Sequence, residues 1–131
     1  MSARDGIYHA EGNTRRSPVR LLQIWIRPNQ LGGKPILGTT SITRPGFNLL
    51  AAPSEAPLTI RQNAWAYAAA LNKEELKIEV PQGRHAYAVS IGELRWGDRA
   101  VSDGDGLLIS PGELSVSGTG QAVLIIQMND I

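Results

Sequence analysis

Short apolar stretches follow one another along most of the chain, and Gly or Pro separates each stretch from the next. Several of them, such as LKIEV and HAYAVSI, alternate apolar and polar residues with a period of two, which is typical of strands with one buried face. Eight short strands predict an all-β fold that closes as a β-barrel or jelly roll. The predicted strands are 21–27, 58–62, 65–71, 76–80, 85–91, 106–109, 113–117 and 122–128.

The segments between these stretches contain residues whose backbone preferences favour tight turns. The run Pro81-Gln82-Gly83 combines a fixed φ with a residue that tolerates positive φ, and residues 103–106 read DGDG. Residues 72–77 could form one helical turn, but the alternation in LKIEV directly afterwards favours a strand. The sequence therefore predicts strands joined by tight turns.

Periodicity divides the chain into three parts of a single domain. Residues 28–57 hold scattered Gly and Pro and little alternation, which indicates an irregular connection. Residues 1–27 precede it as an N-terminal arm that ends in the predicted strand 21–27, and residues 58–131 form the predicted barrel.

The composition argues against several classes of binding partner and of chemical site. Lys and Arg number 13 and Asp and Glu 12, so the net charge of +1 provides no large attraction to nucleic acid or to an anionic membrane. The chain has no cysteine, which excludes disulfides, thiolate metal sites and a cysteine nucleophile. No apolar run approaches the ~20 residues of a membrane span, and the N-terminus lacks the pattern of a signal peptide. We expect a cytoplasmic protein that binds neither nucleic acid nor membrane.

Candidate chemistry is sparse, because the chain holds only His9 and His85 as imidazole ligands. His9 and Glu11 are two residues apart, so on a strand both side chains would project from one face and could bind one cation. For His85 a structural hydrogen bond is the favoured role, since a lone imidazole rarely forms a site. The cluster of Arg15, Arg16 and Arg20 is interpreted as a solvated turn.

Several segments in a fixed order resemble the pirin-like proteins, a family with two cupin barrels. Residues 6–13, GIYHAEGN, are similar to the segment that completes the metal site of the first barrel, and LLQIWIRP follows at the expected distance. Later segments resemble successive strands of the second barrel: LTIRQNAWAYAAAL, QGRHAYAVSIGEL, GDGLLIS and AVLIIQM. The resemblance implies a cupin-type barrel preceded by an arm, residues 1–27, that corresponds to a remnant of the first cupin.

The resemblance also implies where a metal would bind. In the family, three His and one Glu hold iron or a similar metal; His9 and Glu11 match the last two ligands, and the first two have no counterpart here. In the second barrel Gly92 sets the cupin register, so His85 falls on the Glu position and residues 78–81 occupy the place of the His pair. We therefore expect no bound cofactor unless another subunit completes the site with iron or another divalent transition metal.

Three functions remain open from the sequence, and the residues favour a non-enzymatic role. The first is a metal-free cupin module that binds or assembles with other proteins, a role that requires no catalytic residues. The second is a metal-dependent oxidoreductase similar to quercetin 2,3-dioxygenase, with His9 and Glu11 in a site shared between subunits. The third is a barrel that binds a small apolar or sugar-like ligand. The unpaired strand 21–27 is expected either to fold back on the barrel or to swap into a neighbouring chain, and the second alternative predicts a homodimer.

Overall fold

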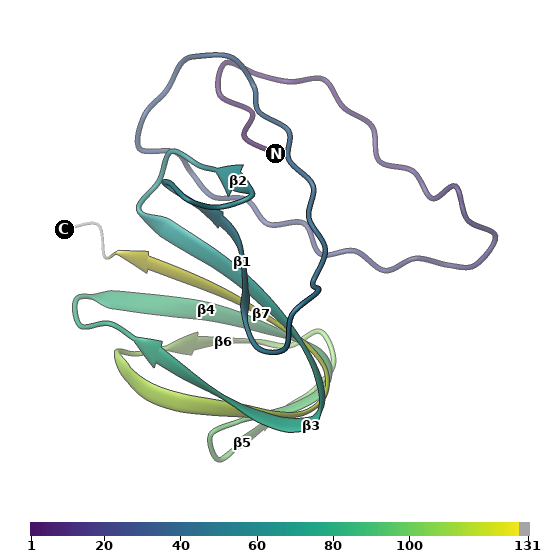
Figure 1. The fold of residues 1–131 in the computed structure, drawn as a ribbon, viewed down its shortest axis with the longest axis vertical. Helices are drawn as coiled ribbons and strands as arrows, with labels where there is room; N and C mark the ends of the chain where they lie inside the picture. The colour runs from purple at the N-terminus through teal and green to yellow at the C-terminus, as the bar shows by residue number, and fades with distance from the viewer. Residues whose placement is uncertain (129–131) are drawn as a thin grey trace.

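A computed structural model describes residues 1–128, and every regular element in that part of the chain is a strand (Figure 1). The all-β prediction is therefore confirmed. The described residues include no helix that is long and apolar enough to cross a membrane. The strands are β1 (Asn48–Ala52), β2 (Leu58–Thr59), β3 (Ala64–Val80), β4 (Arg84–Trp96), β5 (Arg99–Val101), β6 (Gly106–Ile109) and β7 (Gly112–Met128).

The strands form one sheet in the order β2-β1-β3-β7-β4-β5, and β6 pairs with the same edge of β4 as β5 does. The pair β1–β2 is parallel and all the other pairs are antiparallel. Strand β7 lies at the centre, because β3 pairs with it from Ala64 to Val80 and β4 pairs with it along the whole of β4.

The two longest strands bend back on themselves and fold the sheet over (Figure 1). Val80 at the end of β3 pairs with Gly112 at the start of β7, whereas Arg84 at the start of β4 pairs with Met128 at the other end of β7. Only a three-residue turn joins Val80 to Arg84. The two ends of β7 must therefore approach each other, and the sheet encloses a core between two layers.

The sequence suggests that one strand ends and another begins near residues 72–77, but the structure has one continuous strand, β3, that bends there. The register shifts between Asn72 and Glu75, and Lys73 takes a left-handed conformation with φ of 71°. The weaker prediction of a helical turn there is wrong, because an irregularity of this kind bends a strand without ending it. The predicted strands 65–71 and 76–80 are two limbs of β3, and 113–117 and 122–128 are two limbs of β7.

The core between the layers consists of small and branched apolar side chains. In β4 the alternate residues Ala86, Ala88, Leu94 and Trp96 are buried, as the period-two pattern predicts. Alanine at so many core positions lets the layers pack closely. The main cluster comprises Ala69, Leu71, Ile78, Val80, Ala86, Ala88, Leu94, Trp96, Val101, Ile109, Val116, Ala122, Leu124 and Ile126.

Two predictions about the first half of the chain are wrong. Residues 21–27 form no strand, because no described segment pairs with them through a ladder of backbone hydrogen bonds. Conversely, β1 lies inside the stretch 28–57 that the sequence predicts to be irregular, where NLLAA pairs with β3 despite its short length. The sheet thus begins at Asn48 rather than at Leu58.

Residues 1–47 form a long loop outside the sheet, and part of it projects away from the barrel (Figure 1). Ser2 and Ile36 pair through two backbone hydrogen bonds of 2.8 and 3.0 Å. The carbonyl of Arg27 accepts a hydrogen bond of 2.9 Å from the buried side chain of Gln62. Ile26 packs against a small second cluster of Ala51, Ala66 and Ile125 on the outer face of the sheet. The arm is therefore attached to the barrel at a few points only.

Candidate functional site

The N-terminal arm brings His9 and Glu11 together, as their spacing predicts. His9 Nε2 lies 3.5 Å from Glu11 Oε1, and the two side chains are 38% and 50% exposed. Asn13, two residues further on, is engaged in a local turn: its side-chain amide donates to the Ser17 carbonyl at 2.8 Å, and its Oδ1 accepts from the Arg15 amide at 3.0 Å. The imidazole and the carboxylate can thus approach one cation without Asn13.

A second limb of the arm runs past this pair. Gln23 Nε2 donates a hydrogen bond of 3.3 Å to Glu11 Oε1, so residues on both sides of the arm loop contact the same carboxylate. A hollow of about 560 Å³ lies between the limbs and is lined by Ala10, Glu11, Gly12, Asn13, Val19 and Leu21. Its lining contributes one charged side chain and is otherwise small or apolar.

The number of ligands limits what this pair can hold. Within residues 1–128 no group of three or more His, Cys, Asp or Glu side chains lies close enough to hold a metal ion. A stable mononuclear site for a divalent transition metal generally needs at least three protein ligands. His9 and Glu11 supply two of them, so their role as metal ligands stays a prediction that depends on groups from another polypeptide or another part of a longer protein.

The barrel interior offers no replacement for the missing ligands. Ile78 and Val80, at the positions where the family resemblance places a His pair, are buried in the main core cluster with Ile109. A buried hydrogen bond there joins the Trp96 indole to Ser90. His85 is partly buried and packs edge-to-face against Tyr87, with the ring centroids 5.0 Å apart. The interior of this barrel is therefore a packed core.

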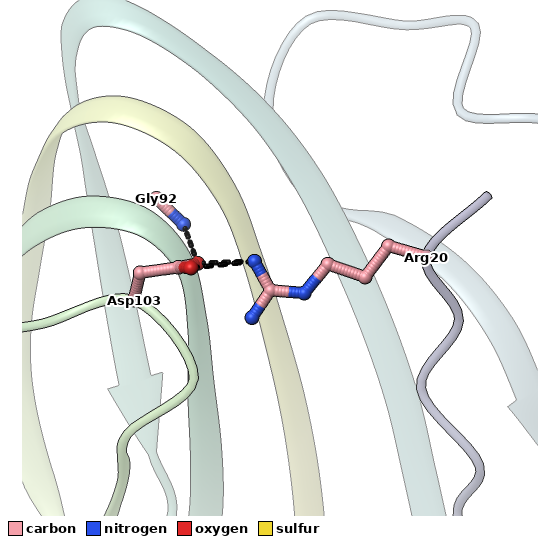
Figure 2. A network of polar contacts seen from close by, with 3 residues as sticks. All are labelled: Arg20, Gly92 and Asp103. Atoms are coloured by element: carbon pink, nitrogen blue, oxygen red, sulfur yellow. Dashed lines mark hydrogen bonds and ion pairs between the residues drawn. The ribbon is translucent and has the colours of Figure 1, made fainter. Parts of the chain in front are cut away.

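An ion pair links the arm to the barrel, and sequence reasoning missed it (Figure 2). Arg20 Nη1 donates to Asp103 Oδ1 and Oδ2 at 2.7 and 2.6 Å, and the Gly92 amide donates to Asp103 Oδ1 at 2.6 Å. The hydrogen bonds from Arg20 and Gly92 lower the pKa of the Asp103 carboxyl. Arg20 is 56% exposed, as expected for a solvated segment, but its ion pair is not predicted, since the partner lies 83 residues away and no local pattern reveals it.

The three tryptophans occupy different environments. Trp96 is buried in the core, and the Arg84 guanidinium lies 4.1 Å from the ring centroid of Trp65. Trp25 in the arm is 86% exposed. Trp96 is thus a core residue, whereas Trp25 presents a large apolar surface to solvent.

Several known proteins are similar to this chain in sequence. The family model described as the quercetinase C-terminal cupin domain matches residues 49–128. A Zymomonas mobilis protein, whose name proposes quercetin 2,3-dioxygenase activity, is 37% identical over 97 residues, which make up 68% of this chain and 41% of that protein. A pirin-like protein of Caulobacter vibrioides is 49% identical over 39 residues, or 30% of this chain and 17% of its own. The chain spans less than half the length of these curated relatives.

Solved structures share the fold. YhhW from Escherichia coli matches 82% of this chain and 49% of its own length, with a TM-score of 0.69 at 21% identity. The structure of bacterial pirin YhhW in complex with nickel(II) matches 79% of this chain and 48% of its own, again with a TM-score of 0.69, at 18% identity. YhaK from Escherichia coli matches with a TM-score of 0.55 at 24% identity over 64% of this chain and 41% of its own. These matches confirm a cupin-type β-barrel.

Proposed function

Because the chain belongs to the pirin-like family through its quercetinase C-terminal cupin domain, we propose that it is a non-catalytic assembly module. In this proposal the metal-free barrel is a stable support, and the arm associates with a second copy of the chain. The observation that carries the proposal is the contrast between a packed barrel interior and an arm whose apolar side chains are exposed.

The packed interior supports a role for the surface of the barrel rather than for its inside. Ile78, Val80 and Leu124 fill the space between the two layers. A small apolar ligand inside the barrel would have to displace such side chains, each of which contributes about 1.5–3 kcal/mol by its burial. The proposed function therefore involves no ligand inside the barrel.

The arm supplies the surface that a partner would cover. In residues 21–27 Ile26 packs on the barrel, whereas Leu21, Leu22, Ile24 and Trp25 are 62%, 41%, 45% and 86% exposed. The backbone of this segment belongs to no sheet. An extended apolar segment with free backbone groups favours pairing with another strand, and two copies related by a two-fold axis would pair the same segment with itself.

The oligomeric state tests this proposal. We expect the purified chain to sediment as a dimer at micromolar concentration, and Trp25→Ser to shift the equilibrium towards monomer by at least about tenfold in dissociation constant. Leu108→Ser is the matched control, because Leu108 is 64% exposed on β6 and lies outside the arm. A monomer at all concentrations, or equal weakening by both substitutions, would contradict an arm-mediated dimer.

The contact between His9 and Glu11 favours a second candidate function, that of a metal-dependent dioxygenase of the quercetin-oxidising kind. A divalent transition metal such as iron, held by His9, Glu11 and ligands from another subunit, would act as a Lewis acid towards a flavonol. The chain's own part in this chemistry is to position one imidazole and one carboxylate. Gln23 orients that carboxylate through its hydrogen bond to Glu11.

Metal content and turnover distinguish the second candidate from the first. After incubation with iron, manganese, copper or nickel, elemental analysis of the wild-type chain would show bound metal, and His9→Ala would lose it together with flavonol oxidation. His85→Ala is the control, since His85 lies in the barrel. If the wild-type chain neither retains metal nor oxidises quercetin, the isolated chain is not a dioxygenase. We also propose the cytoplasm as its compartment, which cell fractionation would test.

A further inference from the structure

Two arginines from distant parts of the chain lie beside the same glycine. In the loop that contains Gly33, a β-carbon built on Gly33 would lie 3.0 Å from Arg61 Nη2 and 3.3 Å from Arg4 Nη1. Arg4 belongs to the N-terminus, whereas Arg61 lies between β2 and β3. Three segments that are far apart in the sequence therefore place two positive charges side by side.

Hydrogen bonds from the barrel and the N-terminus fix this loop. Arg61 Nη1 donates to the carbonyls of Leu31 and Gly32 at 2.9 and 2.5 Å. The Gly33 amide donates to Asp5 Oδ2 at 2.8 Å, and the Asn29 amide donates to the Arg61 carbonyl at 2.7 Å. Arg61 thus holds the loop with one Nη group and directs the other towards Arg4.

The guanidinium of Arg4 lacks both a hydrogen-bond acceptor for its buried Nε atom and a carboxylate partner for its charge. Its Nε atom is buried and makes no hydrogen bond, and no described carboxylate lies within ion-pair distance of Arg4 or Arg61. Arg4 also has a left-handed backbone, with φ of 50°. A buried donor without a partner costs about 1–3 kcal/mol, and more when the group is charged. Strained backbone around unsatisfied donors is a feature of ligand sites.

The carboxylate of Asp5 compensates only part of the charge of the two arginines. Asp5 is the nearest acidic residue in the sequence, and its Oδ2 is engaged by the Gly33 amide. Lys34 follows directly in the loop and adds a further positive charge. The junction of the arm and the barrel is therefore positive, although the whole chain has a net charge of only +1.

We propose that Arg4 and Arg61 form a binding site for an oxyanion, and that a phosphate group is the ligand they fit best. Guanidinium groups bind phosphate and carboxylate oxygens through charge-assisted hydrogen bonds, and phosphate can accept from two guanidinium groups at once. The Nη groups that Arg4 and Arg61 place beside Gly33 are the donors that such a ligand would contact. The site is separate from His9 and Glu11, and it stands whether or not the chain dimerises.

The test is a titration of the full chain with inorganic phosphate at constant ionic strength, followed by NMR of the arginine side-chain Nε–H signals and the Gly32 and Gly33 amides. We expect saturable shifts of these signals, and a dissociation constant that rises at least about tenfold in Arg4→Ala. Arg4→Ala removes no hydrogen bond of the fold, whereas Arg61→Ala also removes the bonds to the loop carbonyls.

Controls separate a specific site from general attraction. Arg44 is exposed and its hydrogen bonds to Asn48 involve only its backbone, so Arg44→Ala should leave phosphate binding unchanged. Titration with acetate separates phosphate from a carboxylate ligand: saturation by acetate at lower concentration than by phosphate would overturn the choice of phosphate. Shifts that fail to saturate, or equal binding in wild type and Arg4→Ala, would overturn the site itself.

Discussion

The indole N–H of Trp96 donates a hydrogen bond of 2.9 Å to the hydroxyl oxygen of Ser90 inside the core. Both residues lie on β4, six positions apart, and both are almost completely buried. The contact satisfies the only polar atom of the largest buried side chain. It also shows that this cupin uses an inward position of β4 for packing rather than for a ligand.

Removing the hydroxyl should leave the indole N–H buried without an acceptor. Ser90→Ala is expected to lower the free energy of unfolding by about 1–3 kcal/mol, measured by urea denaturation. Ser102→Ala, at an exposed position, should change it by less than about 0.5 kcal/mol. If the double variant Ser90→Ala with Trp96→Phe loses the full sum of its single variants, the two groups do not interact.

The bend in β7 depends on a glycine at its closest approach to β4. A β-carbon on Gly120 would collide with the Ile91 carbonyl oxygen and lie 3.1 Å from the Gly92 Cα, and the φ of Gly120 is 151°. Gly120→Ala should therefore cost at least about 3 kcal/mol in thermal unfolding, or prevent folding. Gly46→Ala is the control, because Gly46 also has positive φ but open space around it; its cost should be about 1 kcal/mol.

The bend in β3 carries a non-glycine residue in a left-handed conformation. Lys73 has φ of 71°, which costs roughly 1–2 kcal/mol relative to an extended residue. Lys73→Gly should raise the free energy of unfolding by about 0.5–1 kcal/mol, after allowing for the greater entropy of glycine in the unfolded chain. Lys77→Gly removes the same charge from the regular part of β3 and should lower the free energy of unfolding. Destabilisation by both changes would show that the Lys73 side chain stabilises the bend.

The sequence predicts the strands well where one face is buried, and poorly where tertiary contacts decide the structure. The alternation in residues 85–91 locates β4 because Ala86 and Ala88 face the core. Nothing local shows that LKIEV continues the strand that contains Trp65, since the bulge between Asn72 and Glu75 is stabilised by pairing with β7.

The candidate site is likewise predictable from the sequence only where local spacing decides the contact. The spacing of His9 and Glu11 predicts their contact, because two residues in extended backbone share a face. The apolar segment 21–27 has the composition of a strand but forms none, since a strand requires a backbone-paired neighbour and no described segment pairs with it. The proximity of Arg4 to Arg61 and of Arg20 to Asp103 depends on the path of the arm across the barrel, which periodicity does not encode.

The attachment of the arm at Asp103 should depend on pH. Hydrogen bonds from Arg20 and Gly92 hold the pKa of Asp103 below its ordinary value of 3.8. A carboxyl whose pKa is lower in the folded state stabilises that state above its unfolded pKa, and the contribution disappears as the pH falls through the folded pKa. The contact should therefore be intact at neutral pH and break only in acid, below about pH 4.

Arg20→Gln should raise the pKa of Asp103 towards 3.8 but not fully restore it, because the Gly92 amide still donates to the carboxylate. NMR titration of the Asp103 side-chain carboxyl measures this directly in both proteins. Lys77→Gln is the control: it breaks the exposed ion pair with Glu113, at 3.2 Å, and should leave Asp103 unchanged. Amide exchange of the arm should quicken in Arg20→Gln at pH 7, where the ion pair holds the arm in the wild type. If Asp103 titrates identically in wild type and Arg20→Gln, the arm does not dock at this carboxylate in solution.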